Sequence, residues 1–320
     1  MSTDLLRPPP RAVLSATRSS VTDLWRPVAT GAYRDLRRPR TASAPKSVPR
    51  TTFDPTLAEN IADPYPELLR IREHPVVVNE RLGVWMMGRY EDVHKAVRNN
   101  EVFSSRDGIM LRSFVTSAVL TTDPPDHTRL RHLTAPMFSK RSVQTLATDI
   151  RALSDEAIRP LRDGDVIDMV AALTIPMPIN VIATILGIPH PQWPAFRTVS
   201  NKFARLFGPR SVHEVMRYVG SLLQSYVQMR SFIDIEMGRR SSTSADDLLG
   251  WLQAAKESGE LSDQEAFFYA LILLVAGNET TTNLLGMLLV RLAEDREFFL
   301  TLKADRSLLR PAVEETARWG

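Results

Sequence analysis

One apolar segment near the end of the chain limits the possible folds more than any other feature. No proline interrupts residues 266–290, so the simplest interpretation is one long, buried helix. Its centre nevertheless contains Gly277, Asn278, Glu279 and three threonines, which lower helix propensity and place polar groups in an apolar setting. Threonine hydroxyls can bond the carbonyl four residues back and open such a helix. We therefore interpret Glu279 and Thr280 as a carboxylate and an alcohol beside a buried reaction space. The alternative is a polar stripe that faces solvent.

The composition is that of an ordinary globular protein. Hydrophobic residues make up 43% and charged residues 24% of the 320 residues, which allows a large core. The polar centre interrupts the apolar segment, so the sequence predicts no membrane span, and the N-terminus has no apolar signal-peptide core. We expect a cytoplasmic protein. The chain contains no cysteine, which excludes disulfides, thiolate ligands and cysteine nucleophiles from these residues.

Positive charge is concentrated in the first fifty residues. They contain ten Lys or Arg against three Asp, whereas the remaining residues contain 30 bases and 34 acids. We predict a disordered, basic, Pro/Arg-rich leader over 1–52 and one folded domain over 53–320. A nucleic-acid or membrane-surface arm is the alternative for the leader, but its arginines stand among Pro, Ser and Thr without aromatic interleaving. The mildly acidic remainder gives no electrostatic reason to expect nucleic acid as a partner.

Periodicity predicts a mostly α-helical domain with a small β part. A hairpin over 76–87, with its turn at 79–83, provides the strands. Residues 100–122 have no clear period and are expected to form a long loop. The segments with helical periodicity are 66–73, 90–99, 124–138, 140–160, 168–187, 192–207, 211–238, 246–257, 263–292 and 308–319.

A second group of candidate residues opens the helical part. Asp123 is a good N-cap, Pro124 suits the first helical position, and Asp126 can complete a capping box. A helix that starts there places His127 and Arg131 on one face, one turn apart. Two donors side by side form a clamp for a carboxylate or a phosphate. Solvated charges on a surface helix are the alternative.

A third candidate is a pair of charges near the end of the chain. Glu315 and Arg318 are three residues apart, so they can pair on one face of a helix. Such a pair contributes little to stability on a surface. Taken singly, it is a weak signal.

In this order, the three features resemble the bacterial soluble cytochromes P450, the haem-thiolate monooxygenases. The resemblance runs from about Asp63 to Gly320 and implies the cytochrome P450 fold, incomplete at the C-terminus. The matching motifs are Gly88–Val93, Phe103–Ser105, Asp123–Arg131, Ile175–Pro189, Asp246–Leu249, Ala276–Thr281 and Glu315–Arg318.

The resemblance implies haem b as the cofactor and assigns residues to it. His127 and Arg131 would bind the haem propionates, which agrees with an anion clamp. Ala276 and Gly277 would let haem and dioxygen approach the helix backbone closely. No other metal site is expected.

The resemblance also implies the reaction and its partners. Thr280 would hydrogen-bond the activated oxygen, Glu279 would help to relay protons to it, and Glu315 and Arg318 would form a structural pair. One atom of O2 would enter a small, apolar organic substrate, with electrons supplied by a ferredoxin-type donor.

The chain departs from the family in its iron ligand. In family members the iron is held by a cysteine thiolate, which lies in a glycine-rich loop after the Glu-x-x-Arg helix, and these 320 residues contain no cysteine. We therefore expect a C-terminally truncated monooxygenase that is inactive as it stands. One alternative is a haem-free P450-like auxiliary protein that binds or activates a partner enzyme, and another is a plain helical scaffold. Retention of Glu279, Thr280, His127 and Arg131 argues against the auxiliary protein, because a chain without oxygen chemistry has no physical need of them.

Overall fold

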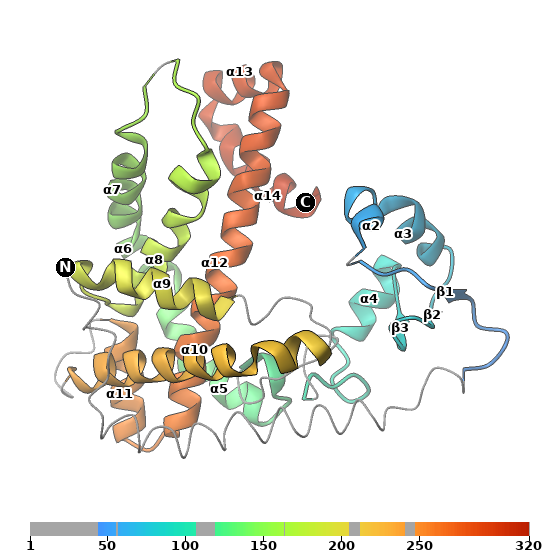
Figure 1. The fold of residues 1–320 in the computed structure, drawn as a ribbon, viewed down its shortest axis with the longest axis horizontal. Coiled ribbons are helices and arrows are strands. Elements are labelled where there is room, and N and C mark those ends of the chain that lie inside the picture. Colours follow the sequence, from blue (N-terminus) through green and yellow to red (C-terminus); the bar gives the residue numbers. More distant parts are fainter. Residues whose placement is uncertain are drawn as a thin grey trace. The chain divides into compact units, whose positions relative to one another are not determined.

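The computed structural model describes residues 44–55, 57–106, 119–162, 164–204, 212–240 and 247–319 (Figure 1). The chain divides into two compact units. Among the described residues, the helical unit comprises 134–162, 164–204, 224–240 and 247–319, and the mixed unit comprises 44–55, 57–106, 119–133 and 212–223. Residues 1–43 of the proposed leader lie outside the described residues, so the leader stays a prediction.

A three-stranded sheet organises the mixed unit. Strand β1 (Arg50–Thr51) runs parallel to β2 (Val77–Asn79), and β2 runs antiparallel to β3 (Val84–Met86). The turn between β2 and β3 includes Gly83 at φ +69°, a conformation that glycine adopts at little cost. Asn79 Oδ1 accepts the Leu82 N–H at 2.9 Å in the same turn. The predicted hairpin is confirmed, and the sheet gains a third strand from the end of the expected leader.

Short helices accompany this sheet. Phe53, Ile71 and Val77 form a small buried core in the mixed unit, with Leu68 and Met86 packed against it. Of the predicted loop, 107–118 lies outside the described residues. The helices are α2 (Ala58–Ala62), α3 (Tyr65–Arg72), α4 (Tyr90–Ala96), the 3₁₀ turn η3 (Val119–Thr121) and α5 (Asp126–Thr134).

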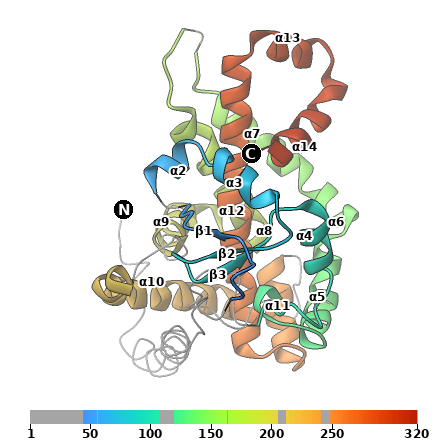
Figure 2. The same cartoon turned by 90° about the vertical axis from the view of Figure 1, so that its right-hand side faces the viewer.

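The helical unit is built around α12 (Asp263–Glu294). Helix α8 (Pro176–Leu186) lies alongside it, α11 (Leu248–Glu257) packs at one end, and α13 (Arg296–Ala304) and α14 (Leu309–Trp319) pack at the other (Figures 1 and 2). Only the part of α10 from Gln224 onward belongs to this unit. Its other helices are η4 (Ala135–Phe138), α6 (Lys140–Thr145), α7 (Ala147–Ile158), η5 (Val170–Thr174), α8 (Pro176–Leu186), η6 (His190–Gln192), α9 (Trp193–Ala204), α10 (Val212–Gly238), α11 (Leu248–Glu257), α13 (Arg296–Ala304), η7 (Arg306–Leu308) and α14 (Leu309–Trp319).

Helix α12 is the predicted long helix, confirmed over 32 residues. Ser262 and Glu265 form a capping box at its start, which satisfies backbone donors that a helix terminus leaves open. Its first half supplies the centre of the core, because every residue from Ala266 to Leu271 is at most 5% exposed. Tyr226 of α10 meets Phe267 edge-on, with ring centroids 5.4 Å apart. The polar centre therefore follows directly after the most buried part of the molecule.

Several helical predictions need correction. The segment 124–138 divides into α5 and the 3₁₀ turn η4, and α2 was not predicted. The segment 140–160 was expected to be one helix, but α6 ends at Thr145 and α7 begins at Ala147. Helix α13 was not predicted, although Asp295 caps it by accepting the Phe298 N–H at 2.9 Å. Asp295 is a typical N-cap residue, so the sequence contained a start signal for this helix. That signal was missed because the long apolar segment before it has a much stronger helical period.

By length and composition α12 is the one helix, among those the structure describes, that could cross a bilayer. The sequence argument that its polar centre rules out a span is therefore too strong on its own. The core helix of a globular protein passes the same test.

Candidate functional site

The polar centre of α12 presents one exposed face. At about 100° per residue, Ala276, Glu279, Thr280 and Asn283 fall within an arc of about 100°, and all four residues are exposed. Thr280 Oγ1 donates to the Ala276 carbonyl oxygen at 2.5 Å, the bond to the carbonyl four residues back that the sequence predicted for its threonines. Because a hydroxyl has one proton and two lone pairs, Thr280 Oγ1 then acts as an acceptor toward the exposed face. A carboxylate and a hydroxyl acceptor thus lie next to each other there.

The opposite side of the same turn packs within the helical unit. A Cβ atom added at Gly277 would lie 2.6 Å from Ile182 Cδ1 of α8. Thr282 Oγ1 donates to the Thr174 carbonyl oxygen of η5 at 3.0 Å. Gly277 therefore has a packing reason to be glycine that involves α8 and no cofactor. Of the two small residues that the sequence assigned to haem, only Ala276 lies on the exposed face.

The predicted clamp lies on α5, in the mixed unit. His127 is half-buried and Arg131 is exposed, one turn apart along the helix. The His127 N–H donates to the Asp123 carbonyl oxygen at 3.0 Å, but α5 begins at Asp126, so the predicted start at Pro124 with Asp123 as its N-cap is wrong. The Asp123 carboxylate instead accepts the Ser105 N–H at 3.1 Å and the Ser104 hydroxyl at 2.5 Å. The bond from Ser104 helps to hold the pKa of the Asp123 carboxyl below its ordinary value.

The charges near the end of α14 pair as the sequence predicted. Arg318 Nε donates to Glu315 Oε2 at 2.7 Å, and Arg318 Nη2 donates to Glu315 Oε1 at 2.5 Å. These bonds lower the pKa of the Glu315 carboxyl and raise the pKa of the Arg318 guanidinium. Both side chains are more than 60% exposed, so a structural role for the pair stays a prediction.

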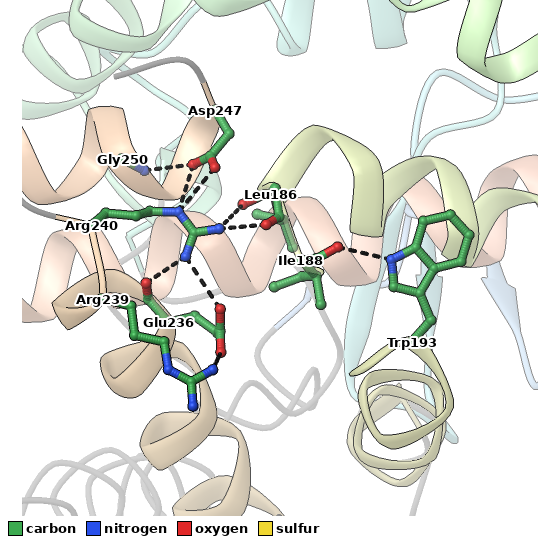
Figure 3. A network of polar contacts seen from close by, with 9 residues as sticks. Leu186, Ile188, Trp193, Glu236, Arg239, Arg240, Asp247 and Gly250 are labelled. Atoms are coloured by element: carbon green, nitrogen blue, oxygen red, sulfur yellow. Dashed lines mark hydrogen bonds and ion pairs between the residues drawn. The ribbon is translucent and has the colours of Figure 1, made fainter. Parts of the chain in front are cut away.

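A larger ionic network was missed by the sequence interpretation. Arg240 Nε donates to Asp247 Oδ1 at 2.8 Å and to Oδ2 at 3.0 Å, and its Nη1 lies 3.3 Å from Glu236 Oε2 (Figure 3). Its Nη2 donates to the Gly187 carbonyl oxygen at 2.5 Å. Gly187 has φ +73°, and an added Cβ there would meet the Asp247 carboxylate. Arg240 thereby ties the end of α8 to the end of α10 and the start of α11. The i,i+4 spacing of Glu236 and Arg240 was visible in the sequence, but no local spacing indicates the bond to Gly187, 53 positions away.

The candidate residues fit a haem only in part. His127 and Arg131 offer donors suited to propionates, and the exposed face of α12 offers the alcohol and the carboxylate. Among the described residues, no group of three metal-ligating side chains could hold an ion. The thiolate that holds haem iron in cytochromes P450 is not among these 320 residues, which contain no cysteine.

Comparison with known proteins identifies the family. No family model matches the chain. The beta-dihydromenaquinone-9 omega-hydroxylase of Mycobacterium tuberculosis is 32% identical over 270 residues, which cover 83% of this chain and 54% of the relative. Cytochrome P450 107B1 of Saccharopolyspora erythraea is 31% identical over 287 residues, which cover 83% of this chain and 67% of the relative.

Solved structures agree with these relatives. The crystal structure of CalO2 matches with a TM-score of 0.74 and 26% identity over 84% of this chain and 69% of that one. Cytochrome P450 CYP109Q5 from Chondromyces apiculatus matches with a TM-score of 0.71 and 29% identity over 83% of this chain. The predicted fold is therefore confirmed, and the chain spans about half to two thirds of the length of the curated relatives it matches. The mostly helical chain, with its small sheet and the polar centre of α12, belongs to the cytochrome P450 family.

Proposed function

We propose that the protein provides the oxygen-activating helix and the propionate-binding helix of a cytochrome P450 monooxygenase, which inserts one atom of O2 into a small, apolar organic substrate. The observation that carries this proposal is the bond from Thr280 Oγ1 to the Ala276 carbonyl oxygen, on the exposed face that also bears Glu279. All three residues are exposed in the structure, so the buried reaction space that the sequence predicted for them requires that bound haem and substrate cover this face.

Thr280 and Glu279 have separate tasks in this proposal. Thr280 commits its proton to Ala276, so its oxygen accepts a hydrogen bond and orients a donor on the exposed face. Glu279 is exposed, so it can take protons from water and pass them toward that position, a general acid–base role. Haem, when bound, supplies the iron at which O2 is reduced.

His127 and Arg131 are proposed to hold the cofactor in place. Their side chains lie one turn apart on α5, a spacing that lets both bind the oxygens of one or two carboxylates. A cysteine ligand for the iron would have to be supplied by other polypeptide, since these 320 residues contain none. We therefore propose that the 320 residues alone do not oxygenate a substrate. The ferredoxin-type donor and the cytoplasmic location stay predictions from the resemblance.

A chimera tests the role of Thr280. It joins the 320 residues to the C-terminal part of cytochrome P450 107B1, which supplies a cysteine loop. Thr280→Ala should keep the haem and raise the share of NADPH electrons that ends in hydrogen peroxide, by about tenfold or more, since one positioned general acid–base group contributes about 10²–10⁴-fold. Thr301→Ala, at an exposed threonine of α13, is the matched control. An unchanged share in Thr280→Ala would remove Thr280 from the mechanism.

The propionate clamp is tested with a second matched pair. Arg131→Ala should speed the transfer of haem from the chimera to apomyoglobin, whereas Arg129→Ala should not. Arg129 lies two residues away, about 160–200° around the helix from Arg131 and from the His127 face. Equal rates for the two variants would show that the clamp is misassigned.

The 320-residue chain by itself, without the added cysteine loop, tests the proposal that it contains no thiolate ligand for haem iron. After addition of haem, reduction and CO, we expect no thiolate-type spectrum. A thiolate-type spectrum would show that the iron has another source of sulfur ligand. A cooperative thermal transition without any haem uptake would instead favour the haem-free auxiliary protein.

A further inference from the structure

Thr282 makes a bond of unusually long sequence separation beside the proposed catalytic residues. Its Oγ1 donates to the Thr174 carbonyl oxygen at 3.0 Å, and the two residues are 108 positions apart. Thr282 is half-buried and Thr174 is fully buried at 0% exposure. The bond therefore joins the centre of α12 to η5, just before α8 begins.

The sequence of α8 explains why an acceptor is present at Thr174. In a regular α-helix the carbonyl of residue 174 would accept the N–H of residue 178. Residue 178 is a proline, which has no N–H, and η5 is itself a π-helical turn with wider hydrogen bonding. A buried carbonyl without this donor is costly. The hydroxyl of Thr282 supplies a donor from another helix.

A second contact of α12, this one with α8, lies about 140° around the helix from Thr282. Gly277 brings the α12 backbone against Ile182 so closely that a Cβ atom would lie 2.6 Å from Ile182 Cδ1. Gly277 and Thr282 are five residues apart, a rise of about 7.5 Å, and they flank Thr280 in sequence. Two such contacts fix both the rotation and the axial position of the intervening turn.

We propose that Thr282 is a positioning residue, whose bond to Thr174 holds α12 in the rotation that turns Glu279 and Thr280 to the exposed face. Thr282 lies about 200° around the helix from Thr280, so it holds the turn from behind and touches no reacting group. This inference rests on the proposed function for its effect on oxygen chemistry. The bond itself can be tested without any cofactor.

The first experiment measures backbone hydrogen exchange of residues 278–286 in the 320-residue chain by mass spectrometry. Thr282→Val removes the hydroxyl at nearly constant shape and should speed exchange by about fivefold, the factor typical of one lost hydrogen bond. Thr282→Ser should restore the slow rate. Thr184→Val is the matched control, because Thr184 Oγ1 donates to Asn180 within its own helix at 3.0 Å. Equal exchange in Thr282→Val and the unaltered chain would overturn the proposal.

A double-mutant cycle distinguishes loss of the bond between Thr282 and Thr174 from general misfolding of the variant. Pro178→Ala gives residue 178 an N–H for the Thr174 carbonyl, so Thr282→Val should accelerate exchange less in that background than alone. Additive effects of the two substitutions would mean that Thr282 and Thr174 are not coupled, which would overturn the proposal. The coupling between the two substitutions is measured by hydrogen exchange and needs no active enzyme.

The oxygen-chemistry arm uses the haem-loaded chimera. Thr282→Val should raise the share of electrons lost to hydrogen peroxide about twofold to fivefold, at unchanged substrate affinity, and Thr282→Ser should restore it. An unchanged share, in a chimera where Thr280→Ala does raise it, would overturn the positioning role. If Thr280→Ala itself has no effect, the proposed function fails, and the exchange experiment still decides whether Thr282 holds the turn.

Discussion

Two ends of the helical unit contain similar amounts of apolar sequence but bury it to different extents. The packed end comprises α8, α11, α10 from Gln224 onward and residues 263–274 of α12. The open end comprises residues 283–294 of α12 together with α13 and α14. At the packed end Leu248, Leu252 and Ala266 are 0% exposed, whereas at the open end Val290 is 56% and Leu300 is 48% exposed. The polar turn that bears Glu279 and Thr280 lies between the two.

This difference shows that hydropathy identifies which residues can be buried, and that partner helices decide which are. Both halves of α12 are apolar, yet residues 266–271 are buried, whereas no residue of 283–294 is. The same contrast holds for charges. Arg240 is 12% exposed at the packed end, and Arg318 is 69% exposed at the open end.

The largest expected effect comes from core truncation. Leu271→Ala should lower the free energy of unfolding by about 2–5 kcal/mol, because Leu271 is 2% exposed and its loss leaves a cavity. Val290→Ala, on the same helix at the open end, should change it by less than about 0.5 kcal/mol. Urea denaturation followed by circular dichroism measures both. Similar losses would mean that the two ends are packed alike.

Removing an arginine should also lower the free energy of unfolding more at the packed end than at the open end. Arg240→Ala should destabilise by about 2–3 kcal/mol, because it removes one of the two arginines paired with the buried Glu236, 2% exposed, together with both bonds to Asp247. Arg318→Ala should produce no measurable loss, since the pair with Glu315 is open to solvent. The same denaturation assay applies. A larger loss for Arg318→Ala would show that the open end is covered in solution.

The two glycines of α12 give a finer comparison. Gly277→Ala should destabilise by about 1 kcal/mol, because the clash with Ile182 outweighs the gain in helix propensity. Gly286→Ala should stabilise by about 0.5–1 kcal/mol, since an added Cβ there meets nothing within 4 Å. Ile182→Val removes the clashing Cδ1 and should rescue Gly277→Ala. Failure of that rescue would place the constraint on Gly277 elsewhere.

The smallest expected effect is a pH dependence at the start of α12. Partial burial would raise the pKa of Asp263, but bonds from Lys256 and Arg230 outweigh it and hold the pKa below the ordinary value of 3.8. The unfolded chain therefore binds this proton first, so the stability contributed by Asp263 is present above pH 3.8 and is lost as the pH falls below it. With 59% of the side chain exposed, the contribution should stay below about 1 kcal/mol.

Asp263→Asn checks this directly. Thermal unfolding between about pH 3 and pH 6 should show a shallower acid loss for the variant than for the unaltered chain. Asp305→Asn, at an exposed aspartate before η7 of the open end whose pKa is also lowered, here by the hydrogen bond from Ser307, is the comparison. A steeper acid loss in Asp263→Asn would reverse the assigned sign.

Sequence alone determined the features that close within one helical turn or one hairpin. The long helix α12, the bond from Thr280 to Ala276, the pair Glu315–Arg318 and the hairpin β2–β3 all follow from spacings of two to four residues or from a short turn. Such spacings are visible in a sequence because the helix and strand periods bring these groups together whatever the rest of the chain does. The family resemblance was visible for the same reason.

Only the tertiary structure decided the contacts between distant segments. The packing of Gly277 on Ile182, the bond from Thr282 to Thr174, and the bond from Arg240 to the Gly187 carbonyl join residues between 53 and 108 positions apart, through helices whose neighbours no local period specifies. It also turned the Asp123 carboxylate toward Ser104 and Ser105. The physical reason is that these contacts depend on how whole helices pack. Helix packing decides which buried carbonyl lacks a donor and which side chain is near enough to supply one.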